Sequence, residues 1–169
     1  MKTVIKRFSE LTTDELYDII KLRVDVFVVE QNCPYAELDG LDKDAVHVWI
    51  EDGDGSEAAA AAEDTPSGDS SADDSHPSPI LAYLRVMDRG AESEHVSIGR
   101  VIAARRRSGL GSAVMKAGIQ AAKDCFGADS IYLEAQCCAV PFYEKLGFEQ
   151  ILGDFVLDGI PHVKMLRRL

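Results

Sequence analysis

The chain of 169 residues is long enough for one domain with a single hydrophobic core, and its 46% hydrophobic and 28% charged residues are typical of a soluble globular protein. No apolar run reaches the roughly 20 residues that a membrane helix needs. The first seven residues also lack the apolar core of a signal peptide. We therefore expect a cytoplasmic protein that does not bind membranes.

The net charge of −11 is unevenly distributed along the chain. Residues 52–79 hold eight acidic side chains and no Lys or Arg, so the other residues carry a net charge of only −3. No basic patch of the size needed to bind a nucleic-acid backbone remains in the rest of the chain. We therefore expect no nucleic acid among the partners.

The first half of the chain predicts a strand, a helix and two further strands. Residues 2–8 form the first strand, and a capping box from Thr12 to Glu15 begins the helix. Apolar side chains recur at helical spacing as far as Phe27, and Asn32-Cys33-Pro34 ends or interrupts the segment. The next two strands, 45–51 and 80–88, flank the acidic segment.

The second half continues this alternation of strands and helices. Its predicted elements are a strand at 95–103, a helix at 109–126 closed by Gly127, a strand at 130–136, a short helix at 140–146 and two strands at 150–157 and 162–168, joined by the turn Asp158-Gly159. No internal repeat interrupts this order. The sequence therefore predicts one α/β domain over residues 1–169.

Residues 53–79 predict a disordered acidic insertion in that domain. The segment is rich in Ala, Ser, Asp, Gly and Pro and has no large apolar side chain to offset the entropy lost on ordering. One interpretation is a tolerated surface insertion. The other is an acidic lid that attracts a cationic acceptor.

The cysteines and histidines show no pattern of a metal or disulfide site. Cys33, Cys125, Cys137 and Cys138 form no C-x-x-C pair, and the four histidines lack the i, i+4 spacing of metal ligands. We expect inert thiols rather than a nucleophile, and no metal.

The segment from Val96 to Ser112 is the most informative part of the chain. It predicts a strand, a turn with three consecutive arginines, and the start of a helix. Free backbone N–H groups and the dipole at a helix start favour an anion, and Gly109 and Gly111 let a phosphate approach the backbone. The spacing Arg106-x-x-Gly109-x-Gly111 fits neither a P-loop nor a dinucleotide fingerprint. The alternative is an ordinary strand-to-helix turn with a basic surface.

This spacing resembles the pyrophosphate signature of GNAT acyltransferases (GCN5-related N-acetyltransferases), which bind acetyl-CoA. The segment Cys138–Phe148, containing "FYEKLGF", is similar to a late motif of the same family. Four further segments resemble the ElaA-like branch of this family: Val26–Tyr35, Ile98–Val101, Glu134–Gln136 and Asp158–Met165. The resemblance implies the GNAT fold, in which helices flank a mixed, mostly antiparallel twisted sheet.

The resemblance also implies how acetyl-CoA is held as a co-substrate. The backbone of Val101, Ile102 and Ala103 would pair with the pantetheine arm, and a free N–H there would stabilise an oxyanion. The side chains of these residues serve as sheet core. The pyrophosphate would meet the turn formed by Arg106, Arg107, Ser108, Gly109, Leu110, Gly111 and Ser112.

Tyr143 and Glu134 are the leading candidates for proton transfer. Tyr143 matches the tyrosine that many GNAT enzymes place near the CoA sulfur, where a neutral phenol can protonate the leaving thiolate. Its alternative role is packing beside Phe142 and Phe148. Glu134 is a candidate base if its face of the strand is the cleft, and a solvated carboxylate if that face points outward. Glu30 and His162 are weaker candidates for the base.

The acceptor side is expected to come from the first helix, the Pro34-Tyr35 turn and the late strands. Its candidate residues are Arg23, Phe27, Gln31, Tyr35, Arg85, Arg100, Gln136 and His162. Arg100 is unusual because an arginine in an apolar strand must find an anion or reach water. It either binds an acceptor carboxylate or pairs with Glu30 or Asp39 and locks the structure.

Together these features predict an N-acetyltransferase that transfers the acetyl group of acetyl-CoA to a primary amine of a small molecule or a peptide, as a monomer or homodimer. One alternative is a binding module that senses acyl-CoA without turnover. Another is an acyl-homoserine-lactone synthase, although no larger acyl pocket is evident in the sequence.

Overall fold

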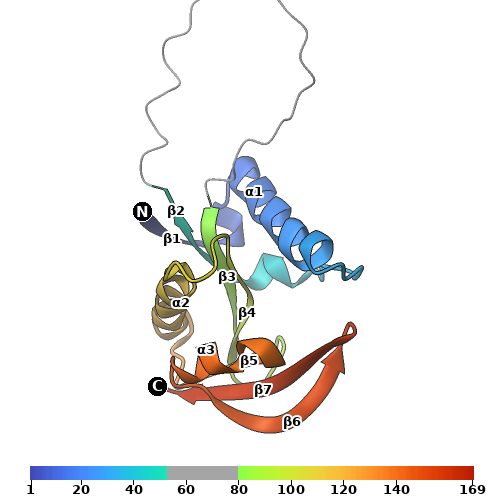
Figure 1. Cartoon of the computed structure of the whole chain (residues 1–169). Coiled ribbons are helices and arrows are strands. Elements are labelled where there is room, and N and C mark those ends of the chain that lie inside the picture. The colour runs from blue at the N-terminus through green and yellow to red at the C-terminus, as the bar shows by residue number, and fades with distance from the viewer. Residues whose placement is uncertain (53–79) are drawn as a thin grey trace, which may run out of the picture.

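The computed structural model describes residues 1–52 and 80–169, and the predicted insertion at 53–79 lies outside the described residues. Seven strands form one sheet (Figure 1). The strands are β1 (Lys2–Arg7), β2 (Val46–Glu51), β3 (Ile80–Met87), β4 (Val96–Ala103), β5 (Ser130–Gln136), β6 (Glu149–Leu157) and β7 (Ile160–Arg168). All seven predicted strands are confirmed, with ends that shift by at most two residues.

The three predicted helices are also present. They are α1 (Thr13–Arg23), α2 (Leu110–Phe126) and α3 (Val140–Glu144). The predicted capping box begins α1, because the Thr12 side chain accepts from the Glu15 N–H while the Glu15 carboxylate accepts from the Thr12 N–H. The first helix differs in one respect: after Arg23 it continues as a π-helix over Val24–Glu30.

The strands lie in the order β1-β2-β3-β4-β5-β7-β6. Every neighbouring pair is antiparallel except β4 and β5, which run parallel. The mixed, mostly antiparallel sheet is therefore as expected. The parallel pair is connected through α2, which is the crossover that parallel strands require.

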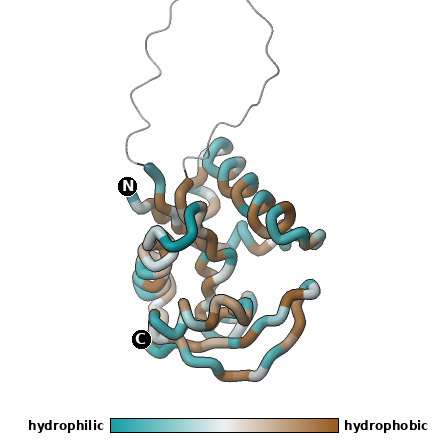
Figure 2. The backbone as a smooth tube through the Cα atoms, viewed as in Figure 1, coloured by the Kyte–Doolittle hydropathy of each residue, from teal (hydrophilic) through white to brown (hydrophobic). Residues whose placement is uncertain are grey.

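Helices cover the two faces of this sheet. On one face, α2 packs Val114 and Met115 into a large core with Val48 and Leu84. On the other, α1 packs Ile19 and Leu22 into a smaller core. Figure 2 shows the hydrophobic colouring concentrated in the inner strands, while the helices alternate between hydrophobic and hydrophilic turns. None of the described helices is long and apolar enough to cross a membrane.

Gly118 lets α2 lie close to the sheet. A Cβ atom at this position would stand 2.7 Å from Cδ2 of Leu84 on β3, which is shorter than any normal contact. The helix therefore approaches β3 more closely than an alanine would allow. This contact holds the middle of α2 against β3.

A bulge interrupts β4 opposite Leu84. Tyr83 pairs with Ile102 and Arg85 pairs with Gly99, so the two residues Arg100 and Val101 face the single residue Leu84. Arg100 has a φ of +56°, in the left-handed region that non-glycine residues seldom occupy. Such a conformation persists only where the surroundings hold it in place.

Candidate active site

The turn between β4 and α2 has the geometry of an anion site. Gly109 has a φ of +83° and precedes the first helical residue, Leu110. The three arginines before it are exposed, and α2 is long enough to present a full set of N-terminal N–H groups. Among the described residues, no side chain caps this helix start. The turn therefore offers backbone donors and fixed positive charge on one exposed surface.

Arg106 in this turn is ion-paired with Glu30 at the end of the π-helix. Both side chains are largely exposed. The pair links the turn before α2 to the end of the π-helix. A carboxylate therefore takes the position next to Arg106 where an anionic ligand would compete with it.

The pairing of β4 with β5 ends before that turn, and we call the facing, unpaired edges of the two strands the slot. The pairing of these two strands joins only Val96 with Ile131 and Ser97 with Tyr132, at their N-terminal ends. Both strands are fully described, and they have no further pairing toward Ala103 and Gln136. The backbone groups of Val101 and Ala103, on the β5-facing edge of β4, are therefore available for a ligand. Those of Ile102 face β3 instead, because the Ala104 N–H donates to the Leu81 carbonyl and the direction of the backbone groups alternates along a strand.

Tyr143 lies on α3 next to the start of α2. Its side chain is 8% exposed and packs edge-on against Phe142 and Phe148, with ring centroids 5.0 and 6.0 Å apart. Its hydroxyl has no hydrogen-bond partner among the described residues. Burial, with a smaller effect of the Cys138 thiol, raises the pKa of Tyr143 well above its usual value. The phenol therefore stays protonated at neutral pH, as a proton donor must.

Phe142 lies between Tyr143 and the candidate anion-binding turn before α2. A Cβ atom added to Gly111, in the first turn of α2, would stand 3.4 Å from the ring of Phe142. This is an ordinary van der Waals distance, so Phe142 on α3 lies directly beside the first turn of α2. The proposed acid and the anion-binding turn are thus adjacent in space.

Glu134 and Gln136 point to one face of β5. Glu134 is exposed and accepts a hydrogen bond of 2.7 Å from the Tyr132 hydroxyl. On the same face, the Gln136 amide donates to Gln31 at 3.0 Å. This face is the one that meets the segment after the π-helix, so the Glu134 carboxylate lies on the side expected for the acceptor.

A hollow of about 490 Å³ lies next to this contact. It is lined by Gln31, Asn32, Cys33, Pro34, Asp158, Gly159 and Ile160, so it sits between the segment after the π-helix and the β6–β7 turn. The Cys33 thiol donates to the Asp158 carbonyl at 3.3 Å across it. His162 is nearby on β7, with its Nδ1 2.8 Å from the Ile160 carbonyl. Because a carbonyl can only accept, Nδ1 is the donor and the lone pair is on Nε2, which has no hydrogen-bond partner among the described residues.

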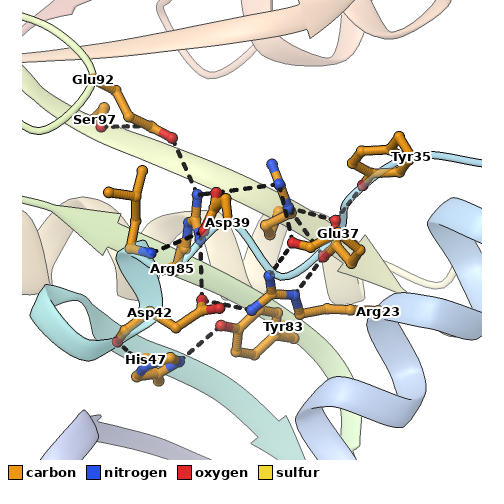
Figure 3. A network of polar contacts seen from close by, with 12 residues as sticks. Arg23, Tyr35, Glu37, Asp39, Asp42, His47, Tyr83, Arg85, Glu92 and Ser97 are labelled. Atoms are coloured by element: carbon orange, nitrogen blue, oxygen red, sulfur yellow. Dashed lines mark hydrogen bonds and ion pairs between the residues drawn. The ribbon is translucent and has the colours of Figure 1, made fainter. Parts of the chain in front are cut away.

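Arginines and carboxylates form a polar network on the α1 face of the sheet (Figure 3). We call this set the arginine network; its members are Arg23, Arg85, Arg100, Glu37, Asp39, Asp42 and Glu92. Arg23 and Arg85 are 1% and 0% exposed. Among the described residues, the only buried side-chain polar atom without a partner is Nε of Arg85. Both guanidinium groups are thus enclosed and neutralised by carboxylates.

The carboxylates of the network bind their arginines at short range. Asp42 accepts from Arg23 at 2.6 Å and from Arg85 at 3.0 Å. Asp39 contacts Arg85 at 2.5 Å and Arg100 at 3.3 Å. Burial alone would raise the pKa of Asp39, but the hydrogen bond from Arg85 and the nearby arginines lower it to about 2. The same balance lowers the pKa of Asp42, so both carboxylates stay ionised.

Of the two partners expected for Arg100, the structure shows Asp39 but not Glu30, which binds Arg106 instead. A partner that the sequence did not reveal is Glu37, whose carboxylate lies 2.8 Å from Nε of Arg100. The structure therefore favours the locking role over the carboxylate-binding role. Tyr35 adds its ring 5.8 Å from the Arg100 guanidinium and donates its hydroxyl to Glu37.

The structure thus distributes the candidate residues over three places. The turn and slot contain the candidates for acetyl-CoA. Gln31, Gln136 and His162 are neighbours on the side expected for the acceptor. Phe27 is partly buried and packs against the smaller core. Arg23, Arg85 and Arg100 belong to the arginine network.

Comparisons with known proteins agree with this geometry. The family model described as acetyltransferase (GNAT) domain matches residues 75–169. Escherichia coli ElaA is 31% identical over 167 residues, covering 95% of this chain and 92% of ElaA. The Bacillus subtilis protein described as uncharacterized N-acetyltransferase YjcF is 32% identical, and the match covers 99% of both chains.

Solved structures show the same fold. The crystal structure of ElaA superposes with a TM-score of 0.78 at 30% identity, and an acyl-CoA N-acyltransferase from Pseudomonas aeruginosa superposes with a TM-score of 0.77 at 34% identity. Each match covers 99% of both chains. With the splayed β4–β5 pair and the glycine turn, these similarities show that the chain belongs to the GNAT acetyltransferase family and is similar to its member ElaA.

Proposed function

We propose that this protein is an N-acetyltransferase that moves the acetyl group of acetyl-CoA to a primary amine in a ternary complex. The splayed β4–β5 pair beside an exposed, arginine-bearing helix start is the observation that carries the proposal. The turn from Arg106 to Ser112 would bind the pyrophosphate. The free edge of β4 from Val101 to Ala103 would bind the pantetheine arm.

In this mechanism the neutral amine attacks the thioester carbon, and a C–N bond forms. The negative charge that develops on the carbonyl oxygen is stabilised by a free N–H on the edge of β4. The C–S bond then breaks and Tyr143 donates its proton to the departing sulfur. Burial supports this role because it keeps the phenol neutral until the thiolate forms.

The amine must lose a proton before or during its attack. Glu134 is the proposed base, acting directly or through water, because its carboxylate is exposed on the face where Gln136 meets Gln31. His162 is the second candidate, since Nε2 of its imidazole is free to accept a proton. Replacing each with glutamine and comparing the pH dependence of kcat/KM separates the two.

The acceptor side is proposed to be formed by Phe27, Gln31, Tyr35, Gln136 and His162. Arg23 and Arg85 are instead proposed to be structural, because carboxylates already neutralise them in the interior. A carboxylate on the acceptor would thus find no free buried guanidinium among these residues. This favours amines without a neighbouring carboxylate.

Release of free thiol from acetyl-CoA tests the function. A panel of alkyl amines, alkyl diamines, amino acids and short peptides with free N-termini should include acceptors that accelerate thiol release, and the acetylated amine should appear by mass spectrometry. Binding of acetyl-CoA without release for any amine would instead support the binding-module alternative.

A further inference from the structure

Arg100 joins the arginine network to the proposed acetyl-CoA slot. Its backbone forms the bulge of β4 at a φ of +56°, directly before Val101. Its side chain extends to the segment 33–44, where it contacts Glu37 and Asp39. One side chain thus connects the bulge of β4, next to the proposed acetyl-CoA slot, to two carboxylates.

Glu37 has the largest share of these contacts. Its side chain is only 4% exposed, and its Oε1 accepts from Nε of Arg23 at 2.6 Å and from Nε of Arg100 at 3.0 Å. Its Oε2 lies 2.8 Å from the same Nε of Arg100. Its backbone carbonyl accepts from the same two guanidinium groups at 3.2 and 3.4 Å. The Tyr35 hydroxyl also donates to Oε2. Glu37 is therefore held between α1, through Arg23, and β4, through Arg100.

Such an anchor has a direct consequence for the strand. A left-handed residue in a strand persists only where contacts over-determine it. The Arg100 guanidinium donates to both the enclosed carboxylate and the backbone carbonyl of Glu37, and these contacts supply that constraint because hydrogen bonds between charged groups are strong and directional. The same carboxylate also accepts from Nε of Arg23 on α1, so Glu37 is held at α1 as well as at β4 and resists relaxation of the bulge.

We propose that Glu37 is a positioning residue of the acyl-transfer site. Through Arg100 it fixes the bulge in β4 and so the direction in which the backbone after Arg100 meets the thioester end of acetyl-CoA. This inference rests on the proposed function. Because the nucleotide end would lie at the turn before α2, the loss of Glu37 should disturb one end of the co-substrate and spare the other.

Asp42 provides a matched control. It is a largely buried carboxylate of the same network, but it contacts Arg23 and Arg85 and not Arg100. Glu37→Gln and Asp42→Asn therefore each remove one charge from the network, and only the first releases the bulge. Arg100→Lys keeps the positive charge and removes the Nε contact, so it provides the test if Glu37→Gln fails to fold.

The experiment compares two ligands by calorimetry in the full chain. Acetyl-CoA has the pantetheine arm, and adenosine 3′,5′-bisphosphate lacks it. We expect Glu37→Gln to weaken acetyl-CoA binding about tenfold and to change bisphosphate binding by less than about twofold, because a displaced edge strand affects only the arm. With the best amine of the panel, kcat should fall by about tenfold or more. Asp42→Asn should leave both affinities and kcat within about threefold of the unaltered protein.

Two results overturn the inference. One is equal acetyl-CoA affinity and kcat in Glu37→Gln and the unaltered protein. The other is an equal loss in Asp42→Asn and Glu37→Gln, which would mean that the network acts only through general stability. A failure of the unaltered protein to bind acetyl-CoA is a different result, because it contradicts the proposed function itself.

Discussion

Glu30 and Arg106 form an ion pair between the end of the π-helix and the turn that precedes α2. The pair is exposed, so its contribution to the free energy of unfolding is small. Its importance lies in its position, because Arg106 is proposed to bind a phosphate. Glu30→Gln should therefore tighten or leave unchanged the Kd for acetyl-CoA. A Kd weakened about fivefold or more would show that Glu30 supports the turn rather than competing with the ligand.

Tyr143→Phe should separate catalysis from packing. The ring contacts with Phe142 and Phe148 remain, and the lost hydroxyl has no partner among the described residues, so Tm should change little. If the hydroxyl protonates the thiolate, kcat should fall by about 10²-fold while the Kd for acetyl-CoA stays within about twofold. Full activity in this variant would remove Tyr143 from the mechanism.

Asp42→Asn should destabilise the fold. The substitution leaves Arg23 and Arg85 with fewer carboxylate partners in the interior, which costs about 2 kcal/mol in the free energy of unfolding. Lys2→Gln is the control, since the pair of Lys2 with Glu51 is exposed and should change stability by less than about 0.5 kcal/mol. Denaturant unfolding measures the free energy of unfolding of both variants. Similar losses would contradict the claim that the buried network stabilises the fold more than an exposed ion pair does.

His47 should make stability fall in mild acid. Burial lowers the pKa of His47 below its ordinary value of 6.5, and its ring contacts the Tyr83 hydroxyl at 2.8 Å and the Asp42 carbonyl at 3.0 Å. Below about pH 6.5, His47 therefore binds a proton in the unfolded chain but not yet in the folded protein. The contribution of neutral His47 to the free energy of unfolding is complete above that pH and is lost as the pH falls toward the folded-state pKa. We expect Tm to fall between pH 6.5 and 5 in the unaltered protein.

In His47→Asn that part of the pH dependence should be smaller, although Tm is lower throughout. Thermal melts of both proteins across the same buffers measure the difference. Parallel curves would show that other groups cause the acid sensitivity.

Gly118→Ala should destabilise the protein although alanine favours helices. The new Cβ would stand 2.7 Å from Leu84, so the helix or the leucine must move, which costs about 1–3 kcal/mol and exceeds the gain in helix propensity of about 1 kcal/mol. Lys116→Ala, on the exposed side of α2, is the control and should stay close to the unaltered Tm. A stabilised Gly118→Ala variant would show that α2 can move away from β3 freely.

Much of the fold could be predicted from local signals. The capping box at Thr12, the C-terminal Gly127 and the Asp158-Gly159 turn each act over a few residues, and each marks the end of an element that the structure shows. The π-helix after Arg23 was not predicted, because its apolar spacing up to Phe27 looks like that of an ordinary α-helix. Local periodicity does not distinguish the two.

The arginine network was harder to predict because it depends on tertiary contacts. The sequence marked Arg100 as an arginine that needs an anion, and Asp39 was named as a partner. Glu37 and Asp42 gave no signal, since isolated carboxylates in a polar segment usually face solvent. The early end of the β4–β5 pairing could not be predicted either, because the composition of a strand does not show where its hydrogen bonding to a neighbour stops.

The most direct test of the account is a calorimetric titration with acetyl-CoA of the unaltered protein and of the variant Arg106→Ala/Arg107→Ala. We expect binding in the micromolar range that weakens about tenfold or more in the variant, with no large change in Tm, because both side chains are exposed in the turn. If the folded, unaltered protein binds no acetyl-CoA, the turn is structural and the proposed acyl transfer is contradicted.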